Sequence, residues 1–322
     1  MTESIESVPR EMAPQLQCMK HSVASKGSPT KLFFETTIKR PVKVSGVGLH
    51  HGAPVSMRLV PADAGTGIRF RRTDLDGFEI LADWRHVAKV SYATSLMREG
   101  VLLSTTEHLL SVLYATGIDN IYVELDNVEV PIVDGSGLPF VEMLKSAGRR
   151  TFDQPRQYLR IVRPVEVVDG GKRIIVEPSD SFDIVCESNF DHPLVGRQTL
   201  DITIEPESYA RDISPARTFG FERDLDQMRE MGLIRGASLD NAVCFGDDGV
   251  LNPGGLRFDD EPCRHKLLDL IGDLAMLGRP LLGRVVATRA GHAMHIALVR
   301  QIMSDPSCYE VTEHASLATA GD

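Results

Sequence analysis

Short apolar runs separated by turn residues fill the first half of the chain and indicate β-strands. These runs mix β-branched and apolar residues, and Gly or Pro follows most of them. We expect strands at 36–44, 55–59, 68–71 and 118–125, and a strand that runs into a turn at 131–136. Helical spacing occurs from Leu109 to Gly117, a residue suited to end a helix, and again at 140–147. This half of the chain therefore predicts an α+β domain.

The second half repeats this order of elements. We expect strands at 158–162, 165–168, 173–177, 182–188 and 283–288, and a closing helix at 292–303. Both halves place a charged residue and a His just before a leucine pair at a helix start, with His108 in the first half and His265 in the second. This self-similarity predicts two similar α+β domains, each a β-sheet layered against helices as a β-α-α-β sandwich with small inserts. The two His-bearing helices are expected to face each other across the junction.

Changes in composition suggest where the domains begin and end. Residues 1–33 carry Ser, Pro, Glu and Lys with little periodicity, so we expect a disordered N-terminal extension. We place the first domain at 34–150, a linker at 148–155, the second domain at 156–303 and a flexible tail at 304–322. Residues 216–260 hold more apolar side chains than a loop needs. They form either a subsidiary β-α-β unit packed on the core or an apolar channel made by that unit.

Three polar residues lie on one side of an otherwise apolar helix. His265, Asp269 and Asp273 are each four residues apart, so at about 100° per residue they share one stripe of the helix. The other positions are mostly Leu and Ile, which indicates a buried helix. Buried imidazole and carboxylate groups are costly unless something binds them, and a divalent metal would do so. The alternative is a solvent-facing pair four residues apart on a helix.

Two further segments carry candidate chemistry. Ser104 and Glu107 have the spacing of a helix capping box, which would give Glu107 a structural role. The alternative places Glu107 and His108 side by side at the exposed start of a buried helix, where a site could open. The glycine-rich segment 46–52 lacks the spacing of a phosphate-binding loop, so we expect a turn between strands, with His50 and His51 on the surface unless a metal uses one.

Composition and charge narrow the possible functions. The 322 residues suffice for about two domains, and a net charge of −10 argues against a general nucleic-acid binder. Five cysteines without paired spacing indicate reduced thiols in a cytosolic protein. The sequence contains neither an apolar run long enough to span a membrane nor an N-terminal secretory signal.

A hydrolytic zinc site would need three protein ligands, an open position, a general base and a proton donor for the leaving group. The HExxH motif is absent, which excludes the common zinc-peptidase helix. His265 and Asp269 supply two ligands of a His2Asp set, and His108 is the best third ligand because Glu107 beside it can serve as base.

Several spaced motifs occur in order and carry a resemblance. They are Thr106-Glu107-His108, Asp119-Asn120, Pro131-Ile-Val-Asp-Gly135, Ala216-Arg-Thr-Phe-Gly-Phe221, Gly255-Leu-Arg-Phe-Asp-Asp-Glu261, His265-Lys-Leu-Leu-Asp269, Gly272-Asp273 and Gly291-His292-Ala293. Together they closely resemble the UDP-3-O-acyl-N-acetylglucosamine deacetylases, the zinc amidases that commit the cell to lipid A synthesis. The resemblance covers residues 32–303. His295 departs from it, since the family more often has Asn there.

Carried over residue by residue, the resemblance implies one zinc ion per chain, bound by His108, His265 and Asp269, with Glu107 as general base. His292 would be the general acid, protonated and held by Asp273. The other implied roles are Thr218 as an oxyanion donor, Lys266 and Lys172 near the nucleotide phosphates, Phe219 as an aromatic substrate contact and Asp224 as a polar group close to the site.

The implied reaction is hydrolysis of the N-acetyl group of UDP-3-O-(hydroxyacyl)-N-acetylglucosamine to acetate and the free amine. The acyl chain would occupy the insert at about 220–246. We expect a cytoplasmic monomer that binds an amphiphilic UDP-sugar and has no nucleic-acid partner, with possible transient contact with a membrane surface. The alternatives are a zinc amidohydrolase acting on a different acylated nucleotide sugar, and a zinc-binding relative without activity.

Overall fold

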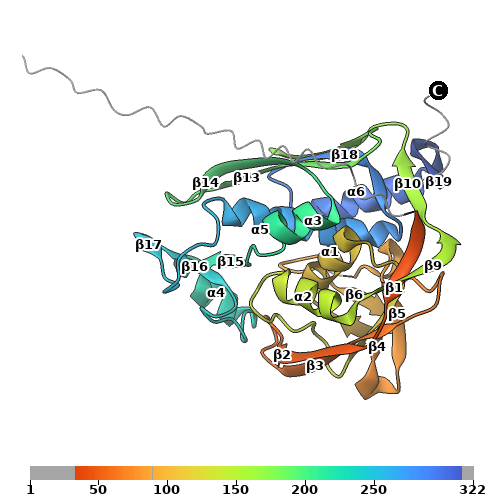
Figure 1. The fold of residues 1–322 in the computed structure, drawn as a ribbon. Coiled ribbons are helices and arrows are strands. Elements are labelled where there is room, and N and C mark those ends of the chain that lie inside the picture. The colour runs from red at the N-terminus through yellow and green to blue at the C-terminus, as the bar shows by residue number, and fades with distance from the viewer. Residues whose placement is uncertain (1–32, 89, 314–322) are drawn as a thin grey trace, which may run out of the picture.

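A computed structural model describes residues 33–88 and 90–313 (Figure 1). The first half forms a five-stranded sheet in the order β2-β3-β8-β4-β5. Its strands are β2 (Val42–Val47), β3 (Pro54–Pro61), β8 (Ile121–Leu125), β4 (Ile68–Arg72) and β5 (Phe78–Leu81). A small hairpin of β6 (Leu96–Arg98) and β7 (Val101–Leu103) follows β5 in sequence, and α1 (Glu107–Thr116) lies between this hairpin and β8. The second helix of this half is α2 (Leu138–Ala147).

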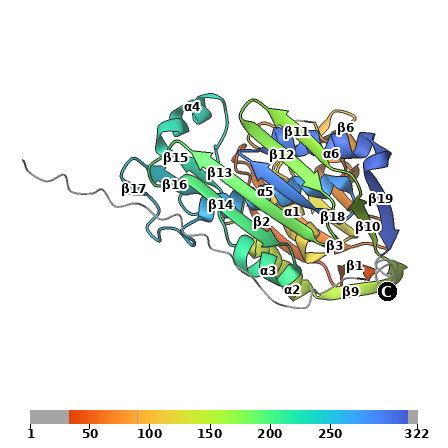
Figure 2. The same cartoon turned by 90° about the horizontal axis from the view of Figure 1, so that it is seen from above.

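The second half forms a seven-stranded sheet. Its main path is β11-β12-β18-β10-β19, and β13 pairs with both β18 and β14. The strands are β10 (Gln157–Ile161), β11 (Val165–Asp169), β12 (Lys172–Glu177), β13 (Phe182–Phe190), β14 (Gly196–Thr203), β18 (Leu281–Thr288) and β19 (Tyr309–Glu313). Figure 2 shows this sheet covering the long helices α5 (Glu261–Leu274) and α6 (His292–Ser304).

Helices α1, α2, α5 and α6 lie between the two sheets, which confirms the α+β fold with helices layered against sheets (Figure 1). Helix α1 of the first half packs directly on α5 of the second, as the repeated helix-start pattern predicts. Nine of the ten residues of α1 and thirteen of the fourteen residues of α5 are buried, because apolar side chains fill most of both helices. One apolar core runs through both halves. The residue bounds of the two domains stay a prediction.

Two segments differ from the sequence prediction near the junction. The strand expected at 36–44 is two strands, β1 (Phe34–Ile38) and β2, because the chain breaks at Pro41, which has no N–H to donate. The expected linker at 148–155 is wrong: Arg149–Pro155 forms β9, which pairs antiparallel with β1. The polar composition of β9 suits this exposed two-stranded ribbon, and it concealed the strand in the sequence.

Residues 216–260 contain the predicted β-α-β unit. Strand β15 (Phe219–Phe221) runs parallel to β16 (Val243–Gly246), and α4 (Leu225–Glu230) connects them. A short strand, β17 (Gly249–Val250), completes this three-stranded sheet. The unit has its own small apolar cluster around Val195, Val243 and Phe245, so it is a separate insert beside the main core.

The remaining differences concern the sheet edges and the chain ends. Strands β5, β6, β7 and β14 were missed. The expected flexible tail is wrong for Tyr309–Glu313, which form β19 on the edge of β10. Residues 131–136 form a single bridge and a turn in place of a strand. The predicted disorder at 1–33 and the tail beyond Glu313 fall outside the described residues, apart from Phe33. Among the described residues, no helix is long and apolar enough to cross a membrane.

Candidate functional site

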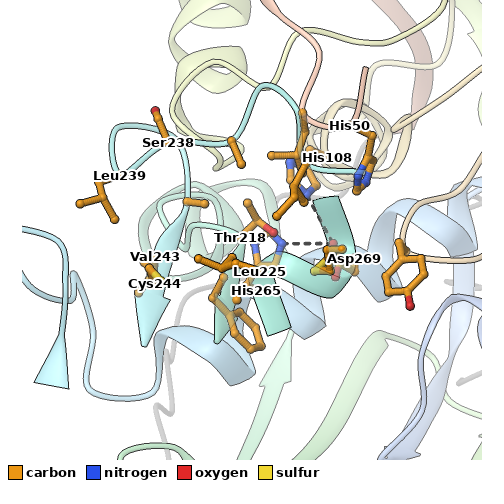
Figure 3. Close-up of a pocket in the computed structure, with 18 of the residues that line it drawn as sticks. His50, His108, Thr218, Leu225, Ser238, Leu239, Val243, Cys244, His265 and Asp269 are labelled. Atoms are coloured by element: carbon orange, nitrogen blue, oxygen red, sulfur yellow. Dashed lines mark ion pairs between the residues drawn. The ribbon is translucent and has the colours of Figure 1, made fainter. Parts of the chain in front are cut away.

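The first turn of α1 and the middle of α5 bring a His2Asp cluster together. His108 follows the first residue of α1, and His265 and Asp269 lie one turn apart on α5 (Figure 3). Their ligand atoms all lie within 4.8 Å of one another. The Asp269 Oδ1 atom is 3.6 Å from His108 Nε2 and 3.4 Å from His265 Nε2. The structure therefore brings together the three residues that the sequence predicts as metal ligands.

The cluster has the properties of a metal site. Ligand atoms that each lie about 2.0–2.2 Å from a tetrahedral Zn2+ are roughly 3.3–3.6 Å apart, which matches the two distances to Asp269. Asp269 Oδ1 is buried and has no hydrogen-bond partner among the described residues. The other nitrogen of His265, Nδ1, bonds to the carbonyl of Ala216 at 3.1 Å, which directs Nε2 toward the cluster.

The protonation states also suit a metal. Burial lowers the pKa of His108 to about 3, and it lowers the pKa of His265, so both imidazoles are neutral. Burial alone would raise the pKa of Asp269, but the Lys266 ammonium and the protonated His292 oppose it and hold that pKa below its usual value. Two neutral imidazoles and one carboxylate are the ligand states that a divalent cation requires.

Glu107 lies beside the cluster with its carboxylate turned into the site. The Thr94 N–H donates to Glu107 Oε2 at 3.1 Å, and Thr106, the N-cap residue of α1, makes no side-chain cap bond. The capping-box interpretation is therefore wrong, because Thr94 holds the carboxylate that a cap would have used. Burial raises the pKa of Glu107 to about 8, although His292 acts in the opposite direction.

His292 and Asp273 form a hydrogen-bonded pair within electrostatic reach of Glu107. His292 Nδ1 donates to Asp273 Oδ2 at 2.7 Å, and His292 Nε2 is directed toward the cluster, 4.0 Å from Asp269 Oδ2. Burial would lower the pKa of His292, but Asp273 outweighs it and raises the pKa to about 9. His295 Nδ1 also lies 2.8 Å from Asp273 Oδ2. The pair thus holds a protonated imidazole facing the metal-site residues.

A cavity of about 470 Å³ opens from this cluster into the insert. Its polar end includes Thr218, Phe219 and Lys266, and the Lys266 ammonium lies 2.7 Å from Asp269 Oδ2 and 5.7 Å from the centre of the Phe219 ring. Its other end is apolar and includes Leu225, Leu239, Val243 and Cys244 (Figure 3). Met228 and Leu251 also line the cavity. The insert is therefore both a packed β-α-β unit and one wall of an apolar cavity.

Two predicted substrate residues lie outside this cavity lining. Lys172 is exposed at the start of β12, and Asp224 ends the short 3-10 helix Glu222–Asp224 that precedes α4. Neither lines the cavity in the described part of the chain. Their roles stay predictions.

Three cavity or cavity-adjacent residues were missed. His50 was expected on the surface, but it is buried and lines the cavity, and neither ring nitrogen has a hydrogen-bond partner of normal geometry among the described residues. Tyr92 lines the mouth, and Thr94 bonds to Glu107 and Asp273. Two adjacent histidines in a glycine-rich turn could have signalled His50, whereas nothing local in the sequence distinguishes Tyr92 or Thr94.

The α+β fold with helices between two sheets, the His2Asp cluster and the flanking carboxylate and imidazole define a hydrolase with the donor set of a metal centre. Comparison with known proteins identifies which hydrolase family this is. The model of the LpxC family, UDP-3-O-acyl N-acetylglycosamine deacetylase, matches residues 35–304, and the chain belongs to this family.

Relatives named UDP-3-O-acyl-N-acetylglucosamine deacetylase agree over most of their length. The chain is 64% identical over 286 residues to the one from Solibacter usitatus (strain Ellin6076), covering 89% of this chain and 97% of that relative. It is 47% identical over 280 residues to the one from Myxococcus xanthus (strain DK1622), covering 87% and 89%. It is 41% identical over 291 residues to the one from Syntrophotalea carbinolica (strain DSM 2380), covering 90% and 94%.

Proposed function

We propose that this protein hydrolyses the N-acetyl group of UDP-3-O-(hydroxyacyl)-N-acetylglucosamine, the committed step of lipid A biosynthesis. The products are acetate and UDP-3-O-(hydroxyacyl)-glucosamine. The observation that carries this proposal is the combination of a buried His2Asp cluster, a carboxylate and a protonated imidazole at one end of an apolar cavity. Family membership and relatives with the same printed name support the substrate.

Zn2+ is the cofactor that we propose, one ion per chain, held by His108, His265 and Asp269. Two imidazoles and one carboxylate are a ligand set of catalytic zinc sites, which keep a further position open. When bound, zinc supplies Lewis-acid chemistry: it lowers the pKa of water and polarises an amide carbonyl. The unpartnered Oδ1 of Asp269 supports this assignment, since a buried carboxylate oxygen needs a donor or a cation.

Glu107 is the proposed general base. Its Oε2 is held by the Thr94 N–H, and its other oxygen is available to take a proton from the attacking water. The raised pKa of Glu107 makes the carboxylate a stronger base than an exposed glutamate. Its place next to His108 on α1 fixes it beside the ligands.

His292 is the proposed general acid. An amine leaves poorly as an anion, so the nitrogen of the scissile amide must gain a proton as the tetrahedral species collapses. His292 Nε2 carries that proton, and Asp273 keeps it there by accepting a hydrogen bond from Nδ1. Glu107 and His292 thus hold opposite protonation roles across the same cluster.

The remaining roles concern the oxyanion and the substrate. Thr218 lines the cavity next to the cluster and is the proposed donor to the developing oxyanion. Lys266 and Phe219 border the same space and are proposed to contact the nucleotide phosphates and the sugar. Lys172 is also proposed to lie near the nucleotide phosphates, and Asp224 is proposed as a polar group close to the site. The 3-O-acyl chain is placed along the apolar wall that the insert at about 220–246 provides.

We further propose that the protein acts in the cytoplasm as a monomer and makes transient contact with a membrane surface. Leu239 and Leu251 support this contact, because both line the cavity and both are more than 40% exposed. A rim of this kind suits the capture of a substrate that carries an acyl chain.

The test is acetate release from UDP-3-O-(hydroxyacyl)-N-acetylglucosamine by metal-stripped protein to which about one equivalent of Zn2+ is restored. Wild type is compared with Glu107→Ala. We expect zinc-dependent turnover that falls by about 10²- to 10⁴-fold in the variant, because it lacks the base. A folded, zinc-loaded wild type without turnover would refute the proposed reaction.

A further inference from the structure

Thr94 contacts both of the groups that are proposed to move protons. Its backbone N–H donates to Glu107 Oε2 at 3.1 Å, and its hydroxyl donates to Asp273 Oδ1 at 2.5 Å. The same hydroxyl lies 3.3 Å from His292 Nδ1. Thr94 is fully buried, so water does not compete for these bonds. One residue therefore connects the base on α1 to the carboxylate that holds the acid.

The position of Thr94 is itself fixed to the start of α1. Its carbonyl accepts hydrogen bonds from the Thr106 N–H at 3.2 Å and from the Thr106 hydroxyl at 3.1 Å. Thr106 is the N-cap residue of α1 and directly precedes Glu107. A shift of Thr94 would therefore also shift the first turn of α1.

Asp273 depends on this hydroxyl. Its Oδ2 atom receives the Nδ1–H groups of His292 and His295, at 2.7 Å and 2.8 Å. In the described part of the chain, Oδ1 of Asp273 accepts its hydrogen bond from the Thr94 hydroxyl. The carboxylate is completely buried, so loss of that donor leaves Oδ1 unsatisfied and the carboxylate free to rotate away from His292.

We propose that Thr94 is a positioning residue that orients Glu107 and the Asp273–His292 pair as one unit. This inference rests on the proposed deacetylase function. No hydrogen bond joins Thr94 to His108, His265 or Asp269 in the described structure. A change in the Thr94 side chain is therefore expected to disturb proton transfer without disturbing metal binding. The backbone bond to Glu107 survives any side-chain change, whereas the bond to Asp273 requires a hydroxyl.

The test compares Thr94→Val, Thr94→Ser and Thr36→Val with wild type. Valine keeps the shape of threonine and removes the hydroxyl, and serine keeps the hydroxyl. Thr36 is the matched control, because it is fully buried and donates its hydroxyl at 2.5 Å to the carbonyl of Gly117, beyond the opposite end of α1. We expect Thr94→Val to lower kcat by about 10- to 100-fold, with KM within about twofold of wild type and bound zinc unchanged. We expect Thr94→Ser to restore most of kcat and Thr36→Val to keep it.

A readout without turnover accompanies the kinetics. Histidine-labelled protein is used to follow the two imidazole N–H protons that bond to Asp273 by NMR, and we expect both to shift in Thr94→Val and to return toward wild type in Thr94→Ser. Unchanged kcat and unchanged N–H resonances in Thr94→Val would overturn the proposal. An increase in KM alone would also overturn it, because it would make Thr94 a substrate contact. If wild type is inactive but Thr94→Val still shows the expected resonance shifts, the deacetylase function is refuted and the positioning role of Thr94 stands.

Discussion

A Cβ atom added to Gly272 would lie 2.1 Å from the carbonyl oxygen of Glu107. Helix α5 therefore meets the start of α1 through bare backbone, and this close approach sets Glu107 beside Asp269 and Asp273. A side chain of any size at Gly272 must push the two helices apart.

Gly272→Ala is therefore expected to lower both stability and activity. Overpacking at a fully buried helix contact costs about 1–3 kcal/mol of the free energy of unfolding, measurable by urea denaturation. Acetate release should fall further than stability alone explains, because Glu107 moves with the helix start. Gly171→Ala is the control, since an added Cβ there meets no backbone and only the tip of the Arg289 side chain at 3.6 Å. Equal activity of the two variants would contradict the close-approach argument.

Metal content should separate ligands from their neighbours. Asp269→Ala removes a proposed ligand, so we expect the purified variant to lose zinc, measured by elemental analysis. Asp273 lies one turn further along α5 and contacts His292 and His295, so we expect Asp273→Asn to keep zinc and to retain only a small, measurable part of its activity. Zinc retention by Asp269→Ala would remove Asp269 from the ligand set.

The pH dependence of kcat should report the acid. With the pKa of His292 raised to about 9, the imidazole is protonated below that pH and loses its proton as pH rises through it. We expect activity to fall on the alkaline side for this reason. Removal of the carboxylate charge in Asp273→Asn takes away the cause of the raised pKa, so the alkaline limb should move to lower pH. If the alkaline fall of activity stays at the same pH in Asp273→Asn, a group other than His292 causes it.

The apolar end of the cavity should select for the acyl chain. Cys244 lies on β16 and lines this end, so Cys244→Phe is expected to fill space that the chain needs (Figure 3). Each methylene that loses its apolar contact weakens binding by about 0.8 kcal/mol. We therefore expect kcat/KM to fall for long-chain substrates and to change little for a short-chain analogue. An equal loss for both substrates would indicate damage to the catalytic cluster instead.

Glu261 is expected to be a major stability determinant. It is almost completely buried. Both of its carboxylate oxygens accept hydrogen bonds from the Arg217 guanidinium, and Oε2 also accepts one from the backbone N–H of Arg257. Glu261→Ala should cost about 3–5 kcal/mol of unfolding free energy, because it leaves the Arg217 guanidinium without its carboxylate partner, with only the Gly255 carbonyl as an acceptor among the described residues. Burial alone would raise the pKa of Glu261, but Arg217 and backbone donors hold it below its usual value. Its stabilisation is therefore present above the unfolded-state pKa and is lost as pH falls through the lower folded-state pKa, which acid unfolding of wild type and variant can compare.

Periodicity predicted the features that depend on one helix or one repeated pattern. The stripe of His265, Asp269 and Asp273 follows directly from the 3.6-residue repeat, and the approach of α1 to α5 follows from the similar helix starts. Of the missed strands, β9, β14 and β19 lie in a separate two-stranded ribbon or at the outer ends of strand paths, where partly exposed strands carry few apolar residues. The other three, β5, β6 and β7, are only three or four residues long, which is too short for a clear alternating pattern.

Contacts between distant residues set the limit of the sequence prediction. Thr94 reaches Asp273 across 179 positions, and no local pattern encodes that distance. His50 was placed on the surface because its turn is polar and glycine-rich, whereas the buried Glu129 binds the backbone N–H groups of His50 and His51 and holds the turn inward. Burial of this kind depends on a partner 79 residues away.

The division of the cluster between α1 and α5 also constrains biosynthesis of the protein. While the ribosome extends the chain, His108 emerges long before His265 and Asp269, and a single imidazole holds a divalent ion only weakly. The nascent first half therefore cannot capture the ion on its own. Loading of the proposed Zn2+ is therefore expected only after α5 has been translated and has docked on α1, so bound Zn2+ would report that both halves have folded against each other.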